Sequence, residues 1–231
     1  MKVLIVIPAY NEEKSILPVL KDLKKNLPEY DYVVVNDGSS DKTAEICKNN
    51  NIPLIDLPVN LGLSGAFSTG MKYAKLNGYD GVIQFDADGQ HRSEFIPKMV
   101  SELTKGYNLV IGSRFVTDKK KLSLRMAGSF LISFAIKITT GKKVQDPTSG
   151  MRLFDKQIIE EFATSLNMTP EPDTVSYLIK RGAKVSEVQV SMEDRTAGES
   201  YLNFSRSIKY MIRMAVSIII LQPFRNGSKL K

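Results

Sequence analysis

The chain has 231 residues, which is enough to bury the core of one large α/β domain. Its one cysteine, Cys47, excludes an internal disulfide framework and a thiolate zinc cluster and suits a reducing cytosol. The net charge of +7 is uneven, because residues 1–113 carry 12 Lys and Arg against 14 Asp and Glu, whereas residues 114–231 carry 20 against 11. We therefore expect the second half to meet an anionic phosphate or membrane surface. Nucleic acid is not expected, because the sequence contains no recognisable nucleic-acid-binding module.

The apolar pattern of the first half predicts strands that alternate with helices. The expected strands cover residues 2–7, 32–35, 52–57, 82–85 and 108–111. The expected helices cover residues 16–23, 43–47, 66–76 and 95–103. Pro8 is expected to end the first strand. Such alternation is typical of an α/β fold with a mainly parallel, Rossmann-like sheet and helices on both faces.

Polar or charged residues follow four of the predicted strands. They are Tyr10 to Glu12, Asn36 and Asp37, Asp86 and Asp88, and Ser113 and Arg114. The carboxyl ends of parallel strands meet at one edge of a sheet, so we expect these residues to share one crevice. Asp86, Asp88 and Gln90 offer the oxygen ligands that Mg²⁺ or Mn²⁺ prefers beside a substrate's phosphates. The pattern therefore predicts a metal and diphosphate site, although an ordinary turn after a strand gives the same pattern in isolation.

The second half contains two basic amphipathic segments, at residues 126–138 and 208–221. Between them the pattern predicts a turn at 145–150 that leads into a strand, a helix at 176–181, a strand at 184–190 and a charged loop at 194–200. Neither segment reaches about 20 apolar residues, so neither is expected to span a bilayer. Each is either a helix that covers the core or a helix that lies in a membrane interface.

Four motifs of the first half resemble those of family 2 glycosyltransferases with the GT-A fold. They are residues 6–12 (VIPAYNE), 35–43 (VNDGSSDKT), 60–62 (NLG) and 86–91 (DADGQH). Segments at 112–114, 146–152, 187–190 and 195–200 are similar, more loosely, to the branch of dolichol-phosphate mannose synthase and the bacterial polyprenyl-phosphate sugar transferases. Asn36 departs from the pattern, where the family often has Asp, and so does Tyr201, where it usually has Lys.

The resemblance implies an inverting transfer from a UDP- or GDP-sugar, with Asp37 accepting a hydrogen bond from the base. The residues implied for the nucleotide sugar are Pro8, Ala9, Tyr10, Glu12, Asp37, Gly65, Asp86 and Arg195. The implied ligands of Mg²⁺ or Mn²⁺ are Asp86, Asp88 and Gln90. The implied catalytic residues are Asp88, Arg114 and Asp146. His91, the only histidine, is interpreted as a turn residue or a neighbour of the ligands.

The acceptor is predicted from the lack of an evident general base. A sugar hydroxyl must lose a proton as it attacks, whereas a lipid phosphate is already anionic and needs only cations to hold it. The residues predicted to hold the acceptor phosphate are Arg114, Arg125 and Ser129. Asp146 either orients the sugar or acts as a base. A polyprenyl phosphate, such as undecaprenyl or dolichyl phosphate, is therefore the expected acceptor, and the product would serve glycan or cell-wall assembly.

The sequence contains no internal repeat or clear linker, so one domain with a membrane-facing extension is expected. Residues 1–205 are expected to form the catalytic domain, with a nucleotide-binding half at 1–113 and an acceptor half at 114–205, and residues 206–231 a membrane-associating helix and tail. The expected location is the cytoplasmic face of a membrane, with a membrane-protein partner or a homo-oligomer left open. Two alternatives remain: a transferase that acts on a sugar hydroxyl, with Asp146 as its base, and a silent nucleotide-sugar-binding scaffold subunit.

Overall fold

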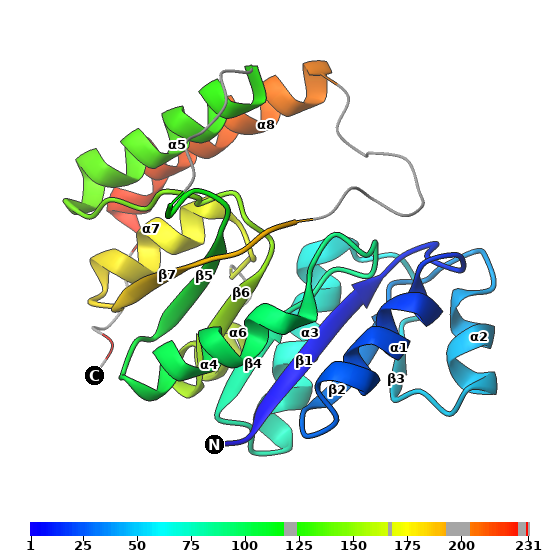
Figure 1. The fold of residues 1–231 in the computed structure, drawn as a ribbon. Coiled ribbons are helices and arrows are strands. Elements are labelled where there is room, and N and C mark those ends of the chain that lie inside the picture. The colour runs from blue at the N-terminus through cyan, green and yellow to red at the C-terminus, as the bar shows by residue number, and fades with distance from the viewer. Residues whose placement is uncertain (118–123, 166–167, 193–203, 226–229, 231) are drawn as a thin grey trace.

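The structure is a computed structural model that describes residues 1–117, 124–165, 168–192, 204–225 and 230 (Figure 1). These residues contain a seven-stranded sheet of order β3-β2-β1-β4-β6-β5-β7. The strands are β1 Val3–Ala9, β2 Asp31–Asn36, β3 Leu54–Asp56, β4 Gly81–Gln84, β5 Leu109–Ser113, β6 Arg152–Asp155 and β7 Val185–Gln189. The α-helices are α1 Ile16–Asn26, α2 Thr43–Asn49, α3 Gly62–Leu76, α4 Ile96–Thr104, α5 Leu124–Thr140, α6 Lys156–Thr164, α7 Pro172–Lys180 and α8 Phe204–Val216. Short helical turns lie at Ser93–Phe95, Ser217–Leu221 and Gln222–Phe224.

The predicted mainly parallel sheet is confirmed. β1 pairs in parallel with β2 and β4, β2 with β3, and β5 with β7. β6 lies between β4 and β5 and is antiparallel to both, so β5 points in the same direction as β4. The carboxyl ends of β1, β2, β4 and β5 therefore all lie at one edge of the sheet. The antiparallel direction of β6 was not predicted.

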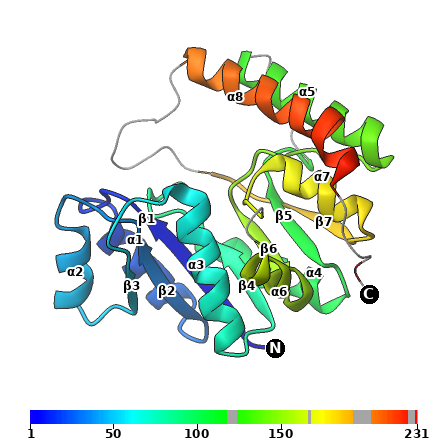
Figure 2. The same cartoon turned by 180° about the vertical axis from the view of Figure 1, so that it is seen from behind.

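Alternate side chains of each strand enter two separate cores. In β1, Leu4 and Val6 belong to one buried cluster, and Ile5 and Ile7 belong to the other. This is the period of two expected for a sheet that is covered on both faces. Helices α3, α6 and α7 cover the first cluster, and α1, α2 and α4 cover the second (Figures 1 and 2).

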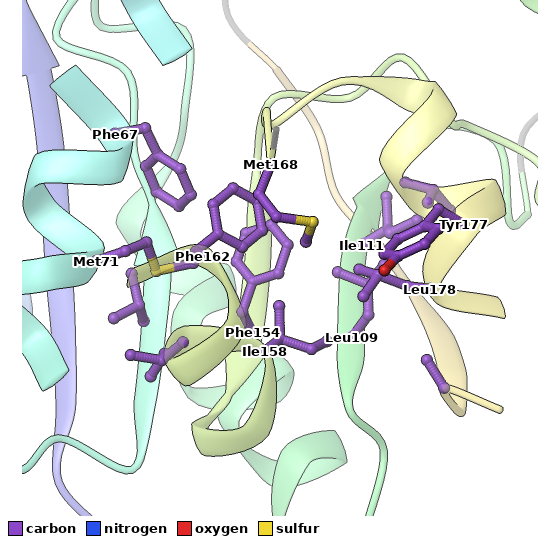
Figure 3. Packing of buried hydrophobic residues seen from close by; sticks show 14 of the residues in the cluster. Phe67, Met71, Leu109, Ile111, Phe154, Ile158, Phe162, Met168, Tyr177 and Leu178 are labelled. Carbon is purple, nitrogen blue, oxygen red and sulfur yellow. The ribbon is translucent and has the colours of Figure 1, made fainter. Parts of the chain in front are cut away.

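Three phenylalanines bind α3 and α6 to the sheet. Phe67 of α3, Phe154 of β6 and Phe162 of α6 are buried, and their ring centroids lie 5.5 to 5.7 Å apart (Figure 3). The tilted and edge-on orientations match the favoured geometry of aromatic pairs. Each such pair adds about 0.5–1.5 kcal/mol to the stabilisation that comes from burying the apolar surface of the rings. This cluster anchors β6 in the middle of the sheet.

One expectation about the elements was wrong, and one helix was missed. β1 does not end before Pro8 but continues to Ala9, because the missing N–H of Pro8 lies on the side where pairing with β4 has already stopped at Val6. Helix α6 was not predicted. It follows β6 directly, and Asp155 caps it by accepting a hydrogen bond from the N–H of Ile158 at 2.9 Å.

Helices α5 and α8 lie side by side at one end of the molecule, above α7 (Figures 1 and 2). They approach closely at Gly128, where a Cβ atom would lie 1.4 Å from the sulfur of Met211. Met211, Met214 and Ile218 belong to the same buried cluster as β1 and α3. Within the described ranges, the helices fall short of the length and apolar character that crossing a membrane requires.

Candidate functional site

The loops after β1 and β2 form one surface. The N–H of Asp37 donates to the carbonyl of Ala9 at 2.8 Å. Asn11, which has a left-handed φ of 57°, accepts through its Oδ1 from the N–H of Ser40 at 2.9 Å. The two motifs that follow these strands in the sequence are therefore neighbours in space, as the parallel arrangement predicts.

Asp37 is buried at this surface and holds the loop before α3. Its Oδ1 accepts from the N–H of Leu61 at 2.7 Å, and its Oδ2 has no hydrogen bond to the described residues. One carboxylate oxygen therefore stays available for a donor on a base. Gly65 lies in the first turn of α3, where a Cβ atom would come 2.4 Å from the Cβ of Leu61. Local packing alone thus requires glycine there, and the proposed contact of Gly65 with a nucleotide stays a prediction.

The other residues predicted for the nucleotide sugar lie at the end of β1 or just after it. Pro8 and Ala9 end the strand, and Tyr10 follows them half-buried. The N–H of Glu12 donates to Oγ1 of Thr43 at 2.8 Å, and its carbonyl accepts the N–H groups at the start of α1. The backbone of Glu12 therefore connects the loop after β1 to α2 and to the start of α1.

Asp86 and Asp88 follow β4 at the same edge. Asp88 is 6% exposed, and its Oδ1 accepts from the N–H of Gln90 at 3.0 Å. The side chain of Asp86 is 33% exposed, and its Oδ2 lies 3.5 Å from Nε2 of His91. Nδ1 of His91 accepts from the N–H of Asp86 at 3.0 Å, so the proton of the neutral ring resides on Nε2. His91 is thus a neighbour that fixes Asp86.

Gly150 packs directly against this pair of residues, a contact that the sequence pattern alone did not reveal. A Cβ atom on Gly150 would lie 3.0 Å from Oδ2 of Asp86 and 3.5 Å from Cε1 of His91. His91 also forms an isolated antiparallel bridge with Met192. Gly150 belongs to the segment 146–152 that carried the family resemblance, which was the only signal for it. The loop before β6 therefore reaches Asp86 and His91, and the segment after β7 reaches His91.

Arg114, directly after β5, forms a two-pronged ion pair with Asp146. Its Nε donates to Oδ2 of Asp146 at 2.7 Å, and one terminal nitrogen donates to Oδ1 at 2.8 Å. The backbone N–H of Arg114 and the hydroxyl of Thr148 also donate to this carboxylate, at 3.1 and 3.2 Å. The side chain of Asp146 is completely buried, whereas that of Arg114 is 30% exposed. The structure thus joins two predicted catalytic residues 32 positions apart.

The surroundings of Asp146 keep it ionised. Burial by itself raises the pKa of Asp146, but the hydrogen bonds and charge of Arg114 outweigh it and leave the pKa below the ordinary value of 3.8. Both carboxylate oxygens already accept hydrogen bonds from Arg114. Asp146 is therefore arranged to orient Arg114.

Two of the residues predicted to hold the acceptor phosphate, Arg125 and Ser129, belong to α5. Ser129 lies on α5 and is 2% exposed. Arg125 belongs to the first turn of α5. Arg195, which was predicted for the nucleotide sugar, lies outside the described residues. Helix α5 touches the loop of Asp146, because the hydroxyl of Ser133 donates to the carbonyl of Gln145 at 3.4 Å. The helix that carries the predicted acceptor residues therefore adjoins the ion pair.

The residues after β4 fit a cation that is shared with a substrate. In the described part of the chain, no three His, Cys, Asp or Glu side chains gather as a metal-binding group. Asp86 and Asp88 supply two carboxylates, and the missing side chain of Gly150 lets the loop before β6 approach Asp86 closely. Such a donor set suits Mg²⁺ or Mn²⁺, which usually takes its remaining ligands from phosphates and water.

Comparison with known proteins identifies the family. A model described as glycosyl transferase family 2 matches residues 4–162. The chain is 29% identical to undecaprenyl-phosphate mannosyltransferase of Micrococcus luteus, over 88% of each chain. It is 34% identical to UDP-N-acetylglucosamine–dolichyl-phosphate N-acetylglucosaminyltransferase of Methanococcus voltae, over 70% of this chain and 72% of that one.

A solved structure supports the predicted GT-A fold. Glucosyl-3-phosphoglycerate synthase of Mycobacterium tuberculosis, crystallised with Mn²⁺ and UDP-glucose, superposes with a TM-score of 0.68 at 17% identity. The superposition covers 98% of this chain and 80% of that one. Because the family model spans more than half of the sequence and the sheet has the expected arrangement, the chain belongs to glycosyl transferase family 2.

Proposed function

We propose that this glycosyltransferase moves a sugar, with inversion, from a UDP- or GDP-sugar to the phosphate of a polyprenyl phosphate at a membrane surface. The observation that carries the proposal is the ion pair between the partly exposed Arg114 and the buried Asp146, because the loop of Asp146 reaches both Asp86 and the amphipathic helix α5. The named relatives act on undecaprenyl phosphate and dolichyl phosphate, which supports a lipid phosphate as the acceptor.

The donor would lie along the ends of β1, β2 and β4. Asp37 would accept from an N–H of the base through Oδ2, and the loop after β1 would form the wall beside it. Asp86 and Asp88, with Gln90, would hold Mg²⁺ or Mn²⁺ against the diphosphate. A divalent cation there would supply positive charge to the departing nucleotide.

The acceptor would meet Arg114. A phosphate monoester needs no general base, and a partly exposed guanidinium whose orientation is fixed by a buried carboxylate is suited to hold one. The alternative, transfer to a sugar hydroxyl, needs a carboxylate that is free to take a proton. The low pKa of Asp146 and its two bonds to Arg114 favour the lipid phosphate.

The end of the molecule formed by α5 and α8 would lie on the membrane. Its exposed apolar side chains, which we call the apolar face, are Phe130, Leu131, Phe134 and Ile138 of α5, Ile208, Ile212 and Val216 of α8, and Ile219, Ile220, Leu221 and Phe224 beyond it. Lys137, Lys209 and Arg213 are exposed on the same helices. Apolar contact combined with attraction to anionic lipids is typical of peripheral attachment. We place this attachment on the cytoplasmic face.

We expect a nucleotide-sugar panel to reveal the donor. With Mn²⁺, the matching UDP- or GDP-sugar at a hundred times its Kd should stabilise the fold by about 2.7 kcal/mol, which raises the Tm of a chain of this size by about 5–10 °C. Asp37→Asn should lose most of this shift in Tm. The NH₂ group of the asparagine is a hydrogen-bond donor and would face the N–H donor of the base. Asp80→Asn, at the opposite end of β4, is the control, and equal shifts in both variants would contradict the assignment of Asp37.

We expect the apolar face to bind vesicles. The double variant Phe134→Glu with Ile212→Glu should reduce sedimentation with phosphatidylglycerol vesicles at least about tenfold, because it places two anionic groups against lipid. Leu76 is 85% exposed on α3, away from this end, so Leu76→Glu is the matched control. Equal loss in the control, or no loss in the double variant, would contradict the proposed orientation.

A further inference from the structure

Glu187 of β7 holds the loop that carries Asp146. Its Oε2 accepts from the N–H of Gln145 at 2.7 Å, and its Oε1 accepts from the N–H of Asp146 at 2.9 Å. Two consecutive backbone donors therefore converge on the two oxygens of one carboxylate. A glutamine could satisfy only one of them and would turn its own NH₂ group towards the other.

Gln189, two residues further along β7, holds the loop that carries Arg114. Its Oε1 accepts from the N–H groups of Val116 and Thr117 at 2.8 and 2.9 Å, and its Nε2 donates to the carbonyl of Arg114 at 3.1 Å. Residues two apart on a strand share a face, so Glu187 and Gln189 project from β7 in the same direction. Gln189 pairs with Ser113, directly before Arg114.

We propose that Glu187 and Gln189 form a clamp that sets the position of Arg114 relative to Asp146, with Glu187 as a positioning residue for the transfer reaction. The clamp fixes the backbone of the loop that carries Arg114 and of the loop that carries Asp146. These two residues are 32 positions apart, and no common helix or strand joins their loops. A misplacement of about 1 Å in such a pair is enough to lower a rate about a hundredfold. The proposal rests on the proposed function, since it assigns Glu187 to the same site.

The kinetic test compares Glu187→Gln with Ser186→Ala. Ser186 faces the other side of β7, where its hydroxyl donates to Glu102 at 2.7 Å, so its removal controls for damage to the strand. We expect Glu187→Gln to lower kcat for transfer to polyprenyl phosphate about 30-fold or more, with the KM for the donor within about twofold. Ser186→Ala should keep both values, and Glu187→Asp should recover part of the loss. The proposal would be overturned if the fraction of unfolded protein accounted for the whole fall in kcat, or if Ser186→Ala lowered kcat equally.

A double-mutant cycle tests whether Glu187 acts through Arg114. In an Arg114→Ala background, Glu187→Gln should cost less than about threefold, because the residue that it positions is already gone. The same fold-loss in both backgrounds would overturn the clamp.

Amide hydrogen exchange provides a readout that needs no activity. In Glu187→Gln, residues 114–117 and 145–148 should exchange faster, whereas the segment of β1 should not change. Unchanged exchange in both loops would overturn the clamp even if activity fell. If the native protein does not transfer sugar to lipid phosphate, the proposed function fails, and the exchange experiment still decides whether the clamp exists.

Discussion

Asp88→Asn is expected to lower the rate of sugar transfer by about a thousandfold or more while the protein stays folded. The asparagine keeps an oxygen for the N–H of Gln90, which Asp88 accepts at 3.0 Å, so the turn after β4 should survive. It loses the negative charge that would hold the cation on the diphosphate. A thousandfold loss corresponds to about 4 kcal/mol, which is the size expected for removing a ligand of a catalytic metal.

The measurement is transfer of radiolabelled sugar to polyprenyl phosphate over a Mn²⁺ titration, together with the Tm of each variant. Asp80→Asn, directly before β4 and so at the opposite end of that strand, should keep full activity. Among the residues that the structure describes, its carboxylate accepts only from the backbone N–H of Lys2. If Asp88→Asn retains Mn²⁺-dependent transfer at a rate similar to the native protein, the assignment of the metal site is wrong.

Asp146→Asn is expected to affect both stability and activity. Breaking a buried ion pair by removing one charge costs about 3–5 kcal/mol, and the partial exposure of Arg114 favours the lower end of this range. For a chain of this size, a loss of about 3 kcal/mol lowers the Tm by about 6–12 °C. Transfer should fall about a hundredfold even below the new Tm, because Arg114 loses its fixed orientation.

Asp56→Asn is the matched control for stability. Asp56 pairs with Lys48 at 2.6 Å, but the two side chains are 37% and 61% exposed. An exposed pair of this kind contributes about 0–1 kcal/mol, so this variant should change the Tm little. Similar losses in the two variants would show that the burial of Asp146 has no special effect.

The pH dependence of unfolding tests the ion pair between Asp146 and Arg114. The pKa of Asp146 is lower in the folded protein than its ordinary value of 3.8, so the ionised carboxylate stabilises the fold fully above that value. This stabilisation is lost as the pH falls through the folded pKa. The difference in unfolding free energy between the native protein and Asp146→Asn should therefore be constant from about pH 5 to 7 and shrink below about pH 4. Urea unfolding at pH 3, 4, 5 and 7 measures it, and a constant difference down to pH 3 would contradict the assigned direction.

The sequence by itself determined the repeating strand and helix pattern of the first half and the polar residues at four strand ends. Aliphatic strands such as residues 82–85 and amphipathic helices such as residues 16–23 are local patterns, and parallel strands place their carboxyl ends at one edge regardless of detail. Asp37, Asp86 and Arg114 therefore lie at the predicted edge.

Only the tertiary structure decided how the second half completes the site. β6 runs antiparallel between β4 and β5, which brings Gly150 against Asp86 and Asp146 against Arg114. Such pairings depend on contacts between residues far apart in the chain, and these contacts leave no periodic mark in the local sequence. For the same reason the motifs indicated Arg114 and Asp146 separately but not their pairing, and the hydrogen bond from the N–H of Asp146 to Glu187 depends on β7 lying beside β5.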